Sequence, residues 1–265
     1  MPSRRTPHYA AANGKRRRTI SSWRHSPAYP DVTSRPFRSV LYVPCSNSRA
    51  LQKLDSLSGR SRPDSVMFDL EDGVSPLQKC KARANLEAFL RYQDTTGYFG
   101  LVRINKRGTE WYEDDVVAAS EMVGKGGVWG AVVPKIESAE CVEEVSRAFN
   151  EASESDSDSE DDNEGGFVRS AVPLWAMIET PLSVLNVANV ARHPSLQGLI
   201  LGTNDLSKEL QVSPSTMSTS TTREGLKVAI QTTILAARAY KKVVIDGVYN
   251  KFAGGCSRNA SLVSA

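Results

Sequence analysis

The feature that most constrains the fold of this chain is a series of seven short apolar segments separated by longer stretches. The segments are almost continuously apolar rather than alternating, which is typical of strands in a parallel sheet that is covered on both faces. We predict strands at 38–44, 65–70, 99–105, 131–134, 172–178, 198–203 and 243–248. Helical spacing of apolar residues predicts helices between some of them, at 76–92, 137–150 and 222–240.

A parallel sheet of this kind either stays open or closes into a barrel. Seven successive β–α units favour a barrel, and no GxGxxG sequence follows the first segment, which disfavours a dinucleotide-binding sheet. The 265 residues suit one barrel domain, which typically needs about 250. We therefore predict an α/β fold of the TIM (β/α)8 type over residues 37–252. In its first long helix we expect a buried stripe made by Leu77, Cys80, Ala84 and Ala88.

Charge is unevenly distributed along the chain. Residues 1–30 hold seven Lys or Arg and no acid, among Ser, Thr and Ala, which is typical of a mitochondrial transit peptide. We expect residues 1–36 to be disordered and the protein to be mitochondrial; a cytoplasmic protein with an extension of no consequence is the alternative. The rest of the chain has no basic patch interleaved with aromatics, so we expect no nucleic-acid partner. It has no run of about 18 apolar residues, so we expect no membrane span.

The cysteines and an acidic stretch give two further predictions. The four cysteines are widely spaced without a CxxC pair, which argues against a zinc knuckle or a disulfide framework and fits a reducing compartment. Residues 151–166 hold eight acids among Ser, Asn and Gly, which predicts a solvated loop insertion on the N-terminal side of the barrel, away from the chemistry.

Charged residues follow several of the predicted strands. In barrels of this type the catalytic groups lie at the C-terminal ends of strands. Glu179 and Asp205 follow neighbouring strands, and two converging carboxylates suit Mg²⁺, which prefers oxygen ligands. Arg103, at the end of another strand, could bind a substrate carboxylate through two parallel hydrogen bonds. Other charged residues at strand ends also have a purely structural interpretation. Asp72 could be a helix cap, Glu71 could form an ion pair with Lys135 or Arg103, and Asp246 could lie in an ordinary turn.

The motifs, taken in order, resemble those of a known family. They are RSVLYVP (38–44), FDLEDGVSPLQKCKAR (68–83), VRIN (102–105), VVPKIESAE (132–140), MIETPLSVLN (177–186), GTNDL (202–206) and IDGVYNKF (245–252). Their order and content are similar to those of the citrate lyase β-subunit-like proteins of the HpcH/HpaI aldolase family, which includes malyl-CoA and citramalyl-CoA lyases.

The resemblance implies a Mg²⁺-dependent lyase that cleaves or forms a carbon–carbon bond between an acyl-CoA and a 2-oxo acid, working as a homotrimer or hexamer when complete. It implies that Glu179 and Asp205 hold the metal, and that Arg103, Asp69 and Glu71 are catalytic, with Arg103 on the oxo-acid carboxylate. Asp69, Glu71 and Asp72 would orient Arg103. The substrate pocket would be lined by Tyr42, Arg49, Lys53, Arg103, Ile245 and Asp246.

The chain also departs from the family pattern. Cys45 replaces the usual Gly after the first strand, and Asn204 replaces the usual Glu before Asp205. Residues 253–265 (AGGCSRNASLVSA) do not resemble the family's eighth strand. We therefore expect a barrel truncated after the seventh strand, with a tail foreign to the family. Two further functions stay open: a citrate lyase β subunit acting on a carrier-protein thioester, and an inactive truncated fragment that interacts with full-length homologues.

Overall fold

The computed structural model describes residues 37–92, 98–154, 171–212 and 220–248. The basic segment 1–36, the tail 253–265 and most of the acidic stretch 151–166 lie outside the described residues. Within the described part, no helix is long and apolar enough to cross a lipid bilayer.

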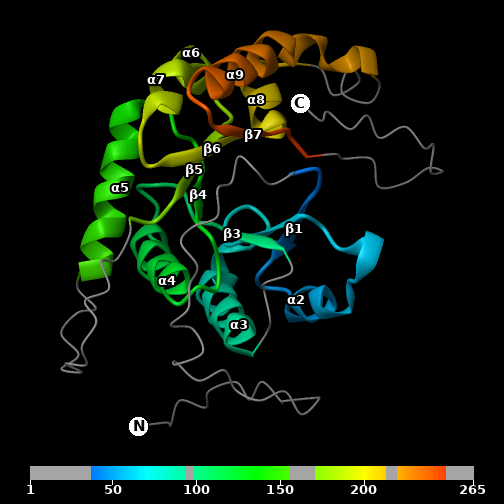
Figure 1. Ribbon diagram of the computed structural model, residues 1–265, viewed down its shortest axis with the longest axis vertical. Helices are drawn as coiled ribbons and strands as arrows, with labels where there is room; N and C mark the ends of the chain where they lie inside the picture. Colours follow the sequence, from blue (N-terminus) through cyan, green and yellow to red (C-terminus); the bar gives the residue numbers. More distant parts are fainter. Residues whose placement is uncertain (1–36, 93–97, 155–170, 213–219, 249–265) are drawn as a thin grey trace.

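Seven parallel strands form a single sheet in chain order, each hydrogen-bonded to the next. They are β1 (Val40–Pro44), β2 (Ser65–Asp69), β3 (Phe99–Arg103), β4 (Ala131–Val133), β5 (Leu174–Ile178), β6 (Leu196–Leu201) and β7 (Val243–Ile245). The sheet curls into a half-barrel with helices around its outside (Figure 1). The predicted α/β class, the parallel sheet and the seven strands are confirmed; several strands are shorter than predicted, most of all β7.

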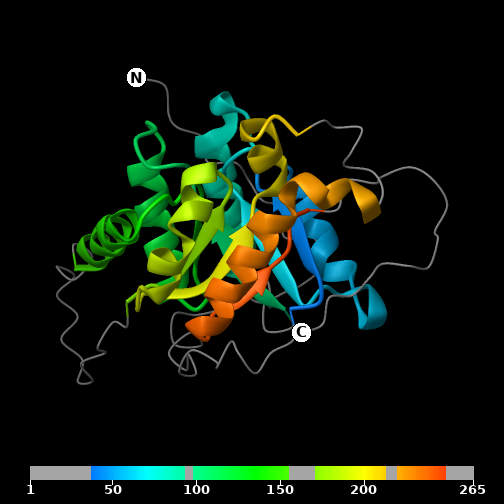
Figure 2. The same ribbon diagram turned by 90° about the horizontal axis from the view of Figure 1, so that it is seen from above.

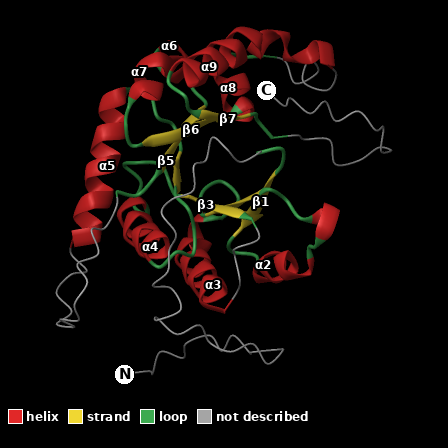
Figure 3. Cartoon of the chain, in the orientation of Figure 1, coloured by secondary structure: helices red, strands yellow, loops and turns green. Residues whose placement is uncertain are grey.

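The helices are α2 (Ser48–Lys53), α3 (Lys79–Tyr92), α4 (Tyr112–Gly124), α5 (Ala139–Glu154), α6 (Pro181–Leu185), α7 (Val187–Arg192), α8 (Thr203–Glu209) and α9 (Lys227–Ala239). Short 3-10 turns occur at Leu54–Ser56, Gly59–Ser61, Pro76–Gln78 and Ser220–Leu226. Figure 3 shows the longer helices following the outer curve of the strands, and Figure 2 shows α9 alongside β6 and β7, which it contacts.

Three details differ from the sequence predictions. The pattern did not indicate α4. Helix α5 continues to Glu154, so the first residues of the stretch 151–166 are helical rather than part of a loop. The predicted stripe of α3 is wrong, because Leu77 is fully exposed and Cys80 is exposed. The face that packs against the sheet is instead made by Lys79, Ala82, Leu86, Phe89 and Leu90.

Two apolar clusters lie on opposite faces of the sheet, because successive side chains of a strand point to opposite sides. On β5, Leu174, Ala176 and Ile178 belong to the cluster under the helices, whereas Trp175 and Met177 belong to the inner cluster. Trp175 lies over Gly198 of β6, where an added Cβ would come within 2.5 Å of ring atom Cε3.

The same alternation carries polar side chains to the inner face beyond the apolar layer. Phe99 and Leu101 of β3 lie in the inner cluster, and Arg103 follows two residues later. Met67 precedes Asp69 on β2 in the same way, and the register pairs Asp69 with Arg103. The C-terminal ends of the strands therefore bring charged residues together next to the inner apolar cluster.

Candidate active site

Arg103 is the centre of a buried charged cluster at the ends of β2 and β3. Its Nε and Nη2 donate to the two oxygens of Asp69 at 2.8 and 2.7 Å, and its Nη1 lies 2.8 Å from Oε2 of Glu71. Burial by itself lowers the pKa of Arg103, but the hydrogen bond and charge of Asp69 and the charge of Glu71 outweigh it, so its pKa is raised. The guanidinium is thus held permanently charged in one orientation.

Asp69 in turn is fixed by the backbone that follows it. Its Oδ1 accepts the N–H of Glu71 and its Oδ2 accepts the N–H of Gly73, both at 2.9 Å. An Asp whose carboxylate bonds the backbone a few residues on stabilises a tight turn. The turn brings Glu71 and Asp72 back toward Arg103, with Asp72 at 3.6 Å from Nη1. The alternative interpretation of Asp72 as a cap does not hold, since Ser75 precedes the 3-10 turn at Pro76–Gln78.

Glu71 has a strongly perturbed carboxyl group. Burial raises its pKa to about 8; Arg103 lowers the pKa, whereas Asp72, Glu179 and Asp69 raise it. Its Oε2 is in ionic contact with Arg103 but makes no well-aligned hydrogen bond among the described residues. A carboxyl that titrates near neutral pH inside a charged cluster is suited to proton transfer.

Tyr42 lies beside this cluster. The centre of its ring is 5.5 Å from the guanidinium carbon of Arg103, within the range of a cation–π contact. Burial raises the pKa of Tyr42 to about 12, so its hydroxyl keeps its proton at neutral pH.

Glu179 and Asp205 follow β5 and β6, which are adjacent strands. Glu179 is buried, and its Oε1 accepts the backbone N–H of Lys135 at 2.7 Å. Asp205, in the first turn of α8, lies 2.9 Å from Nζ of Lys208 and 3.8 Å from Nζ of Lys135. Burial raises the pKa of Glu179; the Lys135 N–H lowers it, and the charge of Asp205 raises it.

This pair of carboxylates fits a magnesium ion. In the described part of the chain no group of three or more His, Cys, Asp or Glu could hold a metal. Mg²⁺, however, is commonly held by one or two carboxylates with water and substrate completing its shell. Burial and the charge of Asp205 both disfavour ionised Glu179, and a cation between the two carboxylates would offset that cost.

A second group of buried polar residues supports the turn after β2, and the sequence analysis did not find it. Nζ of Lys79 donates to the carbonyls of Leu70 and Glu71, both at 2.8 Å, and to Oδ1 of Asn105 at 2.6 Å. Asn105 also bonds Asp115, which pairs with Arg83. A buried Lys on a helix face looks like an exposed one in sequence, so the pattern carried no signal for it.

Four other expected residues are placed less centrally. Arg49 and Lys53 of α2 are exposed, and in the described part of the chain no hydrogen bond or ion pair joins them to Arg103 or Glu179. Ile245 is buried in the inner apolar cluster. Asp246 is paired with both terminal nitrogens of Arg223, at 2.7 and 2.8 Å.

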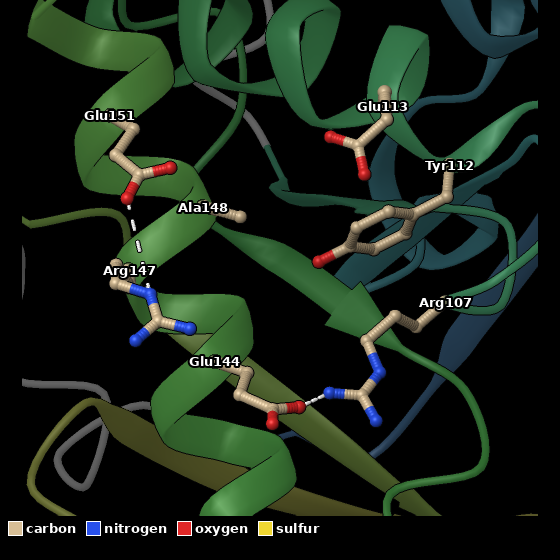
Figure 4. Close-up of a pocket in the computed structure, with 7 residues that line it drawn as sticks. All are labelled: Arg107, Tyr112, Glu113, Glu144, Arg147, Ala148 and Glu151. Atoms are coloured by element: carbon tan, nitrogen blue, oxygen red, sulfur yellow. Dashed lines mark ion pairs between the residues drawn. The ribbon is translucent and has the colours of Figure 1, made fainter.

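A pocket between α4 and α5 is separate from this cluster (Figure 4). Two ion pairs lie in its lining: Arg107 with Glu144, and Arg147 with Glu151 along α5. The full lining is Arg107, Tyr112, Glu113, Glu144, Arg147, Ala148 and Glu151. It shares no residue with the carboxylates and arginine at the strand ends.

A curled parallel β/α sheet with helices outside it and charged residues at its strand ends is the architecture of (β/α)-barrel proteins. The HpcH/HpaI aldolase/citrate lyase family model matches residues 38–259. The chain belongs to this family, as the motifs indicated.

Named relatives include two kinds of protein. A (3S)-malyl-CoA thioesterase from Cereibacter sphaeroides (strain ATCC 17025 / ATH 2.4.3) is 39% identical over 217 residues, which cover 82% of this chain and 65% of the relative. The citrate lyase subunit beta of Haemophilus influenzae is 30% identical, covering 80% and 66%. The chain thus spans about two thirds of the length of these relatives.

Solved structures share the fold. The protein CitE from Mycobacterium tuberculosis in complex with magnesium and acetate is 25% identical, with a TM-score of 0.59 over 80% of this chain and 74% of that one. The citrate lyase beta subunit of M. tuberculosis complexed with oxaloacetate and magnesium is 24% identical, with a TM-score of 0.62 over 83% and 82%.

Proposed function

We propose that this chain acts as a Mg²⁺-dependent lyase on the carbon–carbon bond between an acyl-CoA and a 2-oxo acid, with malyl-CoA or citramalyl-CoA as the bonded form. The observation that carries the proposal is the juxtaposition of Arg103 with the Glu179–Asp205 pair at one end of the sheet. Family membership and a magnesium-bound relative support it.

Arg103 would bind the oxo-acid carboxylate. Its two hydrogen bonds to Asp69 use two of the five N–H donors of a guanidinium, and Nη1 is also in ionic contact with Glu71, so N–H donors are left for a substrate. Asp69 fixes the plane of the guanidinium through these two bonds, and a planar carboxylate can match a pair of parallel donors in that plane.

Glu179 and Asp205 would hold the metal, which when bound would polarise the oxygen on the carbon that becomes the oxo group. Glu71 would carry the proton that moves between the hydroxyl form and the acyl-CoA carbanion, since its pKa of about 8 lets it be either acid or base near neutral pH. Tyr42 would stay protonated, with its ring in cation–π contact with Arg103.

Thioester hydrolysis is the second candidate function, because the malyl-CoA thioesterase relative is 39% identical. It predicts different products. A lyase releases a 2-oxo acid and leaves the thioester intact on the acyl-CoA, whereas a hydrolase consumes water and releases free malate and the CoA thiol.

One experiment separates the two candidates. The full chain is incubated with Mg²⁺ and malyl-CoA or citramalyl-CoA, and the 2-oxo acid and the free thiol are measured in parallel. We expect oxo acid without free thiol, and no product when Mg²⁺ is chelated. Free thiol without oxo acid would assign hydrolysis instead. If neither product forms, both candidates are overturned. If product forms only when the substrate is a carrier-protein thioester, a citrate lyase β subunit is favoured.

A further inference from the structure

Lys135 combines an unusual backbone conformation with a place at the proposed metal site. Its φ is 51°, in the left-handed region that non-glycine residues rarely adopt. Two other non-glycine residues in the described part of the chain have a positive φ, Gln211 and Lys241. Each of those lies just past the C-terminus of a helix, α8 or α9, where a left-handed residue is an ordinary ending. Lys135 follows a strand, so that explanation does not apply to it.

In this conformation the backbone N–H of Lys135 donates to Oε1 of Glu179 at 2.7 Å. The other oxygen faces Gly202, where an added Cβ would lie 2.6 Å from Oε2. Glu179 is therefore fixed on two sides: one oxygen by the N–H of Lys135, the other by close contact with a residue that has no side chain.

Glycine would adopt this backbone shape with less strain, yet the chain has a lysine here. The ammonium of Lys135 lies 3.8 Å from Oδ2 of Asp205. It is thus close to both carboxylates of the proposed metal site, through its backbone to one and through its side chain to the other. Strained residues persist where the surrounding structure uses them.

We propose that Lys135 is a positioning residue for the magnesium site: its left-handed backbone fixes the ligand Glu179, and its ammonium balances the paired carboxylates until the metal replaces it. This inference rests on the proposed function, because it assumes that Glu179 and Asp205 hold the metal. It separates two roles of one residue, and substitutions can test them separately.

Three variants of the full chain make the test, with Mn²⁺ binding followed by electron paramagnetic resonance as the readout and Mn²⁺ standing in for Mg²⁺. Lys135→Gly keeps the N–H and the backbone shape but removes the ammonium. Lys135→Met removes the charge and keeps the length of the side chain. Lys135→Val removes the charge and resists the left-handed shape, since it is β-branched.

We expect Lys135→Gly and Lys135→Met to bind Mn²⁺ several-fold more tightly than the unsubstituted chain, because a competing positive charge is gone. We expect Lys135→Val to bind about 10-fold to 100-fold more weakly than Lys135→Gly, the range typical for losing a group that orients a metal ligand. Equal affinities of the Val and Gly variants would overturn the backbone role. Weaker binding by the Gly and Met variants would overturn the role of the ammonium.

A measurement on the unsubstituted chain covers the case in which the Val variant does not fold. The amide hydrogen of Lys135 should exchange slowly with solvent, and more slowly still with Mn²⁺ or Mg²⁺ added; rapid exchange would overturn the backbone role. If the unsubstituted chain binds neither ion while this amide stays protected, the proposed metal site fails and this inference fails with it.

Discussion

Replacing Glu71 by Gln tests the electrostatics of the cluster through stability alone. Burial raises the pKa of Glu71 to about 8 from its ordinary value of 4.5. A carboxyl whose pKa is higher in the folded chain than in the unfolded chain binds its proton more tightly when folded. The folded state is therefore favoured at low pH, and this advantage is lost as pH rises from the unfolded pKa to the folded one.

The size of the effect follows from the two pKa values. Each unit of difference corresponds to about 1.4 kcal/mol. The rise from 4.5 to about 8 thus lowers the free energy of unfolding by roughly 5 kcal/mol between pH 4.5 and pH 8. Gln is close to protonated Glu in size and cannot ionise. We expect Glu71→Gln to match the unsubstituted chain at about pH 5, and to become more stable than it by several kcal/mol at about pH 8.5.

Urea unfolding of both chains across this pH range measures the difference directly. Glu87→Gln is a matched control, because Glu87 is exposed on α3 in an ion pair with Arg91. A difference between the Glu71 variant and the unsubstituted chain that does not change with pH would show that Glu71 titrates normally. The account of this cluster, and the role of Glu71 in moving a proton, would then be wrong.

Three further predictions concern neighbouring parts of the structure. Arg103→Lys keeps the charge but loses the fork that bonds both oxygens of Asp69; we expect 2-oxo acid binding in an equilibrium titration to weaken about 10-fold or more, and unchanged affinity would refute the assignment. Lys79→Met removes the donor to the carbonyls of Leu70 and Glu71 and to Oδ1 of Asn105, so the free energy of unfolding should fall by about 3 kcal/mol in urea titrations, and a neutral effect would contradict the buried network. Gly198→Ala places a methyl group against the ring of Trp175; a loss of about 1–3 kcal/mol is expected by the same measurement, and no loss would mean that the inner cluster is loosely packed.

The sequence was sufficient for the order of the strands and for the residues at their ends. Continuous apolar runs located the strands, and alternation within β3 and β5 explains why Arg103 and Glu179 reach the inner face. The motifs identified the family, which the family model confirmed. The assignments of metal ligands and substrate contacts stay predictions that the experiments above test.

Other features depended on tertiary contacts that a pattern does not contain. The buried face of α3 was mispredicted because it includes Lys79, and lysine is normally exposed. Lys79 can be buried because the turn after β2 and Asn105 supply three acceptors for its ammonium. The raised pKa of Glu71 comes from burial among residues on other strands. The left-handed backbone of Lys135 likewise depends on Glu179, 44 residues further along the chain.

A crystal structure of the chain with Mg²⁺ and a 2-oxo acid such as oxaloacetate would examine the proposed site most directly. We expect one ion within about 2.1 Å of a carboxylate oxygen of Glu179 and of Asp205, with the acid's carboxylate on N–H donors of Arg103 that Asp69 does not use. Well-ordered side chains at 179 and 205 with no ion between them, in crystals holding saturating Mg²⁺, would contradict the proposal that these residues form a magnesium-dependent lyase site.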